Sequence, residues 1–112
     1  MQRIEAIVRH IVLDDVLEAM DGLGIHGMTV TEVKGFGKQK GYTETYRGSK
    51  VTIRLRPKLK LEMVVRDADV DRVVEAIRSV AHTGDIGDGK IFVSDIGSAL
   101  AIRTGRSGEE AL

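Results

Sequence analysis

The sequence has 112 residues, enough for one domain with one hydrophobic core and too few for two lobes around a catalytic cleft. Its 17 basic and 17 acidic residues cancel, which excludes a bulk charge that would draw the whole molecule to nucleic acid or to a membrane. Because the chain has no cysteine, disulfides and thiolate metal sites are excluded as well.

The first part of the chain predicts a strand, a helix and a second strand. Residues 3–9 are rich in β-branched side chains and bounded by charged ones, as in a short strand. Apolar residues recur three and four apart over 16–20, which predicts an amphipathic helix, and a β-like run follows at 28–33. The same three elements return later in the chain, at residues 60–66, 73–77 and 91–93.

Two βαβ units in so short a chain predict an α+β, ferredoxin-like fold. A four-stranded antiparallel sheet would then carry both helices on one face. The bare face would include Ile7, Glu62 and Val64, a mixture that neither solvent nor a core favours. We therefore expect other copies of the chain to cover this face in a cyclic homo-oligomer; a monomer with a half-polar sheet face is the alternative.

A long basic segment separates the two units. Residues 37–55 are expected to form a mobile loop, because they are far too many for an ordinary hairpin connection. The stretch from Gly37 to Arg56 contains one acid, Glu44, among its basic residues: Lys38, Lys40, Arg47, Lys50, Arg54 and Arg56. Contact with an anion or an acidic surface is the expected use, and a solvated β-ribbon whose charges prevent edge pairing is the alternative.

Two glycine-rich segments could bring backbone amides close to a phosphate. They are Gly-Phe-Gly-Lys at 35–38 and Gly-Asp-Ile-Gly-Asp-Gly-Lys at 84–90. Glycine permits close approach of the backbone, and the adjacent lysine would neutralise charge. Neither segment matches the Walker or dinucleotide fingerprint, and plain turns are the alternative. A third basic segment at 103–106 suggests that these loops share one phosphate site.

Other kinds of chemistry find little support in the sequence. The three histidines lack ligand-like spacing, and no serine nucleophile has a recognisable setting with a histidine and an acid. The absence of asparagine excludes an acylphosphatase-like mechanism on this fold. Asp14 and Asp15 are expected to cap the first helix. A ferredoxin-like RNA binder would need stacking aromatics, for which only Phe36 and Phe92 are available.

No targeting segment or membrane span is expected. The opening residues 1–5 predict a charged strand, and no apolar run approaches the roughly 20 residues that a span needs. The protein is therefore expected in the cytoplasm.

Together these segments resemble the PII nitrogen-regulatory signal-transduction proteins over essentially the whole chain. Residues 83–93 are similar to the second signature of that family. Residues 27–30, 32–37 and 39–41 resemble the first half of the family's sequence pattern. The resemblance implies one PII-like domain over residues 1–112 that forms a homotrimer. It also implies three functional segments: the T-loop at 37–55, a second nucleotide loop at 83–90 and a C-terminal loop at 101–112.

The resemblance implies ATP or ADP bound between subunits. The adenine and ribose would be surrounded by Ile7, Thr29, Gly35, Glu62 and Val64. The neighbouring subunit would bring backbone amides and charges to the phosphates, from Gly87, Asp88, Gly89, Lys90 and Arg103. Phe36, Gly37 and Lys38 complete the expected contacts. Gln39 would help hold Mg²⁺, and Lys58 would pair with the distal carboxylate of the effector 2-oxoglutarate.

The resemblance further implies a regulator of nitrogen assimilation rather than an enzyme, with slow ATP hydrolysis as an incidental property at most. Ligand state would bias the T-loop conformation, and a partner would read it; nucleic acid is not expected as a partner. The partner contacts would come from the loop tip: Tyr46, Arg47, Gly48 and Ser49. Arg47 resembles the residue with which relatives block an ammonium transporter, so membrane contact is expected only through such a partner.

Several positions depart from the family pattern. Val51 stands where many members carry a uridylylated tyrosine, so that modification is not expected, and Ser49, phosphorylated in some relatives, is the remaining candidate. Lys38 and Ala101 stand where family members often have arginines that touch the polyphosphate, and Asp85 stands where a lysine is common. The alternative is therefore a specialised paralogue with altered nucleotide preference that regulates another transporter or enzyme, for example in inorganic-carbon uptake.

Overall fold

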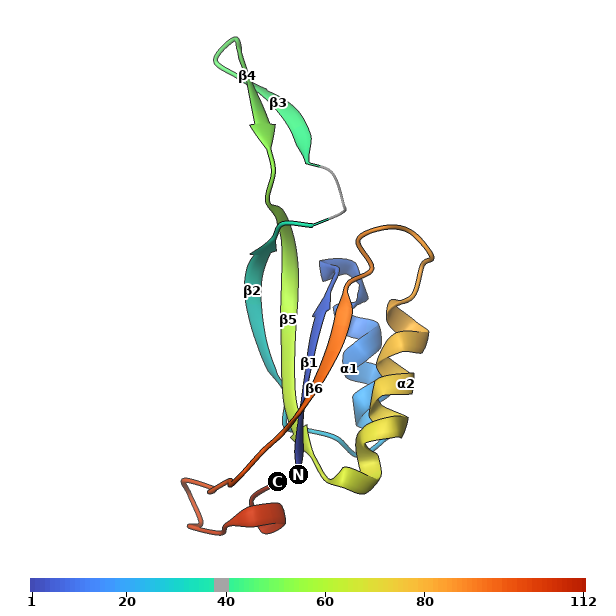
Figure 1. Ribbon diagram of the computed structural model, residues 1–112, viewed down its shortest axis with the longest axis vertical. Helices are drawn as coiled ribbons and strands as arrows, with labels where there is room; N and C mark the ends of the chain where they lie inside the picture. Colours follow the sequence, from blue (N-terminus) through green and yellow to red (C-terminus); the bar gives the residue numbers. More distant parts are fainter. Residues whose placement is uncertain (38–40) are drawn as a thin grey trace.

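A four-stranded antiparallel sheet organises the computed structural model, which describes residues 1–37 and 41–112 (Figure 1). The described strands are β1 (Gln2–Val8), β2 (Thr29–Gly35), β3 (Tyr42–Tyr46), β4 (Ser49–Ile53), β5 (Arg56–Val65) and β6 (Lys90–Asp95). The α-helices are α1 (Leu13–Gly22) and α2 (Val70–Ala81), and short 3₁₀ turns lie at His10–Val12, Asp67–Asp69 and Gly108–Ala111. No helix among these residues is long and apolar enough to cross a membrane.

The strand order β2-β5-β1-β6 confirms the predicted ferredoxin-like arrangement. Every pair in this sheet is antiparallel, and β1 lies between β5 and β6. Both helices lie against one side of the sheet, and β2 forms one of its edges (Figure 1). The two βαβ units read from the sequence are therefore interleaved, because each half contributes one central and one edge strand.

The core lies between the helices and the sheet. Alternate residues of β1 and β5 are buried, as the two-residue period of a strand requires. From the helices, Val16 and Met20 of α1 and Val73 and Ile77 of α2 are buried at a spacing of four, which confirms the predicted apolar stripes. The sheet contributes Ile4, Ala6, Val8, Leu59, Leu61, Met63 and Val65.

The opposite face of the sheet carries the mixed set predicted for it. Ile7, Glu62 and Val64 alternate with the buried positions and are half-buried, although both helices lie on the other side. Register places Ile7 beside Lys60 on one side and Lys90 on the other. Apolar and charged side chains thus share a face that no α-helix of residues 1–37 and 41–112 covers (Figure 1).

The expected long loop contains regular structure. Strands β3 and β4 pair as a hairpin whose turn is Arg47-Gly48, both with positive φ (51° and 81°), as in the mirror-image turns that match strand twist. Almost every residue of the hairpin is exposed. The ribbon projects from the main sheet and gives the molecule its long dimension of 57 Å (Figure 1). The described part of residues 37–55 therefore forms a solvated β-ribbon, the alternative predicted from the sequence for this segment.

The beginning of α1 differs from prediction. Val12 occupies the N-cap position, and no side chain makes a capping hydrogen bond there. Asp14 and Asp15 lie within the first turn instead, where their charges favour the positive end of the helix dipole. The expected capping role of these two residues was wrong because the preceding 3₁₀ turn already leads the chain into the helix.

Truncation of Met20 tests the position of the core. Its side chain is 1% exposed, so Met20→Ala is expected to lower the free energy of unfolding by about 2–5 kcal/mol. Leu17→Ala on the same helix is the control, because Leu17 is 44% exposed and should cost less than about 1 kcal/mol. Urea unfolding at one protein concentration measures both values; equal losses would contradict this packing.

Candidate functional site

A pocket of about 560 Å³ brings the two predicted glycine-rich segments together. The predicted site residues that line it are Ile7, Gly35, Phe36, Gly37, Lys58, Gly87, Asp88, Gly89 and Lys90. Strand pairing explains the meeting, because Gly35 of β2 pairs with Arg56 of β5, while Lys90 of β6 pairs with Ile7 of β1. Segments far apart in the sequence therefore converge at one end of the sheet.

The second glycine-rich segment lies directly against β1; together with Thr83 it forms residues 83–90, which we call the glycine loop. A Cβ atom at Gly89 would fall 1.6 Å from the carbonyl oxygen of Ile7, and the φ of Gly89 is +100°. Any larger residue would therefore meet both a steric clash and a strained backbone. Gly84 and Gly87 also have positive φ (93° and 106°), so the loop backbone depends on three glycines.

The carboxylate of Asp88 ties the loop to its own beginning. It accepts hydrogen bonds from the backbone N–H of Thr83 at 2.8 Å, the N–H of Gly84 at 2.9 Å and the hydroxyl of Thr83. These bonds hold the pKa of Asp88 well below its ordinary value of 3.8, the Thr83 hydroxyl contributing most. The ionised form therefore stabilises the loop at neutral pH, and this contribution is lost as the pH falls below that ordinary value.

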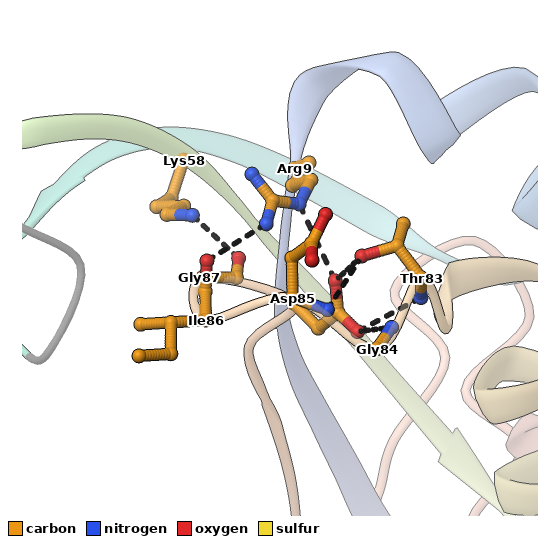
Figure 2. A network of polar contacts seen from close by, with 8 residues as sticks. Arg9, Lys58, Thr83, Gly84, Asp85, Ile86 and Gly87 are labelled. Atoms are coloured by element: carbon orange, nitrogen blue, oxygen red, sulfur yellow. Dashed lines mark hydrogen bonds and ion pairs between the residues drawn. The ribbon is translucent and has the colours of Figure 1, made fainter.

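Two cations reach the glycine loop from the sheet (Figure 2). Nη2 of Arg9, which follows β1, donates to the carbonyl of Ile86 at 2.9 Å, and Nζ of Lys58 on β5 donates to the carbonyl of Gly87 at 2.6 Å. Lys58 is only 8% exposed. Burial lowers its pKa, and the positive charges of Arg9 and Arg56 lower it further. An anionic ligand would stabilise the charged form of this lysine.

A second group of predicted residues lies elsewhere. Thr29, Glu62 and Val64 line another pocket, of about 530 Å³, together with the segment after α1 and the C-terminal residues. The family resemblance predicts these three residues beside Ile7 and Gly35, with the glycine loop contributed by a neighbouring subunit. In the structure Ile7 and Gly35 share a pocket with the glycine loop of the same chain, because β1 pairs directly with β6.

The remaining predicted residues are dispersed. Arg103 lies exposed in the C-terminal segment and lines neither pocket. Tyr46, Arg47, Gly48 and Ser49 form the exposed tip of the hairpin, where the Arg47 guanidinium lies 5.3 Å from the centre of the Tyr46 ring. Lys38, the expected phosphate contact, and Gln39, the expected magnesium ligand, fall outside the described residues. No cluster of metal-binding side chains occurs in residues 1–37 and 41–112.

Sequence reasoning missed Arg9. Its charge bounds the first predicted strand, yet its side chain contacts Asp88, which lies 79 positions later in the sequence. One signal could have found it. In an antiparallel sheet, the residue after β1 lies beside the loop that enters β6 if these two strands are neighbours, as the predicted fold requires.

Substitution of Gly89 tests the contact with β1. Gly89→Ala is expected to destabilise the protein by at least about 1–3 kcal/mol, because strain at positive φ adds to the clash with Ile7. Gly97→Ala is the matched control, since a Cβ there meets nothing within 4 Å and no positive φ opposes it. Urea unfolding of the two variants gives the comparison, and a fully stable Gly89→Ala protein would disprove the close approach.

Comparison with known proteins identifies the family. The family model described as "Nitrogen regulatory protein P-II" matches residues 1–106. The chain is 54% identical to the nitrogen regulatory protein P-II of Pasteurella multocida (strain Pm70), 52% to that of Azospirillum brasilense and 53% to that of Rhodospirillum rubrum, each over 112 residues that cover 100% of both proteins. The resemblance inferred from the sequence is thus confirmed, and with it a regulatory, signal-transducing role rather than an enzymatic one. This chain belongs to the nitrogen regulatory protein P-II family.

Proposed function

We propose that this protein senses adenine nucleotides at sites between copies of itself and regulates partner proteins of nitrogen assimilation through the β3–β4 hairpin. One observation carries the proposal. Two glycine-rich segments from distant parts of a P-II family chain meet in one pocket beside the buried cation of Lys58. Closely approaching backbone amides together with lysines are what a polyphosphate requires.

The chemistry of the pocket suits a nucleoside polyphosphate. Gly87 and Gly89 line the pocket and have no side chain to shield the loop backbone, and Lys90 supplies charge beside them. Ile7 and Phe36 offer apolar surface for a base. Because Thr29, Glu62 and Val64 line a different pocket of the chain, each pocket holds only part of the expected set. A homotrimer in which that second group comes from a neighbouring copy would complete each site, with Arg103 reaching the phosphates.

Lys58 is the residue proposed to bind a second ligand, a dicarboxylate. Its ammonium is buried near two other cations and already donates to the carbonyl of Gly87. A carboxylate of 2-oxoglutarate would compete with that carbonyl, so effector binding would act on the glycine loop. Mg²⁺, held by Gln39 and the nucleotide phosphates, would join effector and nucleotide, since this hard cation prefers oxygen ligands.

The hairpin is the proposed output. β4 ends at Ile53 and β5 begins at Arg56, so the ribbon continues into the strand that carries Lys58. Register puts Glu44 opposite Val51 and Tyr46 opposite Ser49 on one face of the ribbon. The exposed tip with Arg47 would enter a partner, for which an ammonium transporter is the leading candidate, and Ser49 is accessible to modification. Binding at Lys58 would thus bias the ribbon that the partner reads.

A calorimetric series tests the ligands. ATP, ADP and AMP are titrated, each with and without Mg²⁺ and 2-oxoglutarate. Tighter ATP binding with both additives is the expected result. A preference for ADP, which the departures at Lys38 and Ala101 make possible, would favour the specialised paralogue, for which Val51 and Ala101 are the motivating departures. If no adenine nucleotide binds at millimolar concentration, the proposal fails.

The same titrations on Lys58→Met isolate the effector. Loss of one charge-assisted hydrogen bond corresponds to about 10- to 100-fold in affinity, so 2-oxoglutarate should cease to strengthen ATP binding while ATP alone still binds. Lys34→Met, at an exposed position of β2, is the control and should retain the effect of 2-oxoglutarate. An unchanged response in Lys58→Met would remove this lysine from the effector site.

A pull-down tests the hairpin. Arg47→Ala should abolish nucleotide-dependent capture of the partner, because the tip then loses its cation and the contact with Tyr46. Lys50→Ala is the matched control, because Lys50 pairs with Thr45 on the face of the ribbon opposite to that of Glu44 and Tyr46. Membrane extracts are compared with each nucleotide present. Absence of an ammonium transporter from every eluate would count against that partner and in favour of another transporter or enzyme.

A further inference from the structure

Arg9 occupies a position from which it can shape the glycine loop. It is the first residue after β1 and has an extended backbone (φ −70°, ψ 147°). Since β1 runs antiparallel to β6, the end of β1 lies beside the loop that enters β6. The side chain is 24% exposed and points into the loop (Figure 2).

The two hydrogen bonds of Arg9 fall on either side of Gly87. Nη2 donates to the carbonyl of Ile86 at 2.9 Å, and Nε lies 3.4 Å from Oδ1 of Asp88. The guanidinium is a rigid planar fork, so both bonds are fixed together. Gly87, at φ 106°, is thereby held between two anchored neighbours. A lysine carries the same charge but lacks this geometry.

Asp88 extends the clamp to the start of the loop. Its other oxygen, Oδ2, accepts the N–H groups of Thr83 and Gly84. One carboxylate thus joins Arg9 to the point where the chain leaves α2. A carboxylate directed at phosphates would repel them, whereas this one is satisfied within the protein.

We propose that Arg9, acting with Asp88, is a positioning residue for the nucleotide: it fixes the backbone of the glycine loop in the shape that presents its amides, without itself holding phosphate. This inference rests on the proposed nucleotide site. It also changes the role of Asp88, which the family resemblance counts among the direct contacts. The alternative role for Arg9 is a plain cation that attracts the ligand.

Arg9→Lys separates the two roles. A cation would be preserved by this change, whereas the clamp would be broken, so we expect ATP and ADP to bind about 10- to 100-fold more weakly. In the nucleotide-free protein, the amides of residues 84–90 should exchange faster with solvent while those of β5 do not. Arg78→Lys is the control, because this exposed arginine of α2 lines a pocket with Asp88 and Gly89 but lies outside the clamp.

Asp88→Asn provides a second variant of the same clamp. Its effect on affinity and exchange should resemble that of Arg9→Lys, and the double variant should lose less than the sum of the two, because both changes remove one interaction. Wild-type affinity in Arg9→Lys would overturn the inference, as would unchanged loop exchange. If the wild-type protein binds no nucleotide while Arg9→Lys still loosens the loop, the nucleotide site is refuted and the clamp is not.

Discussion

The approach of Gly89 to the carbonyl of Ile7 is the constraint on which the candidate site depends. It sets the glycine loop on the end of β1, within reach of Arg9 and next to the strand that carries Lys58. At Gly89 no side chain fits between the loop and β1, so backbone packs directly on backbone at this point. The position of the loop therefore follows from the β1–β6 pairing, and the core that stabilises this pairing also shapes the pocket.

Charge is arranged locally in a chain that is neutral as a whole. Arg9, Arg56 and Lys58 stand close enough for the two arginines to lower the pKa of the lysine, and Asp88 only partly offsets them. Like charges held close together repel each other, and an anion that binds between them would relieve this repulsion. The Lys58–Gly87 contact meanwhile links the base of the hairpin to the glycine loop, so the two regions share one polar network.

Local patterns predicted the fold well. The apolar spacings of 16–20 and 73–77 are properties of single helices, and the sheet order followed from repeating βαβ units. Hairpin β3–β4 was harder, because an exposed ribbon needs no apolar alternation and its basic residues suggested a loop. The glycine segments were identified, but their shared pocket and the role of Arg9 arise from pairing between distant strands, which no local spacing encodes. Capping by Asp14 and Asp15 failed for a similar reason, since the 3₁₀ turn before α1 was not foreseen.

The internal duplication gives the chain two related but different pockets. The segment after α2 meets the end of β1, and the segment after α1 meets the end of β5 at Arg66, so one pocket is a pseudo-symmetric counterpart of the other. When one half-site of a protomer pairs with the other kind of half-site on the next protomer, the contact between the two copies is head-to-tail. An open pair of copies then has one complete site and two unused halves, whereas a closed ring of any size has as many sites as copies. Under the proposed function, a nucleotide that binds only to complete sites would favour ring closure.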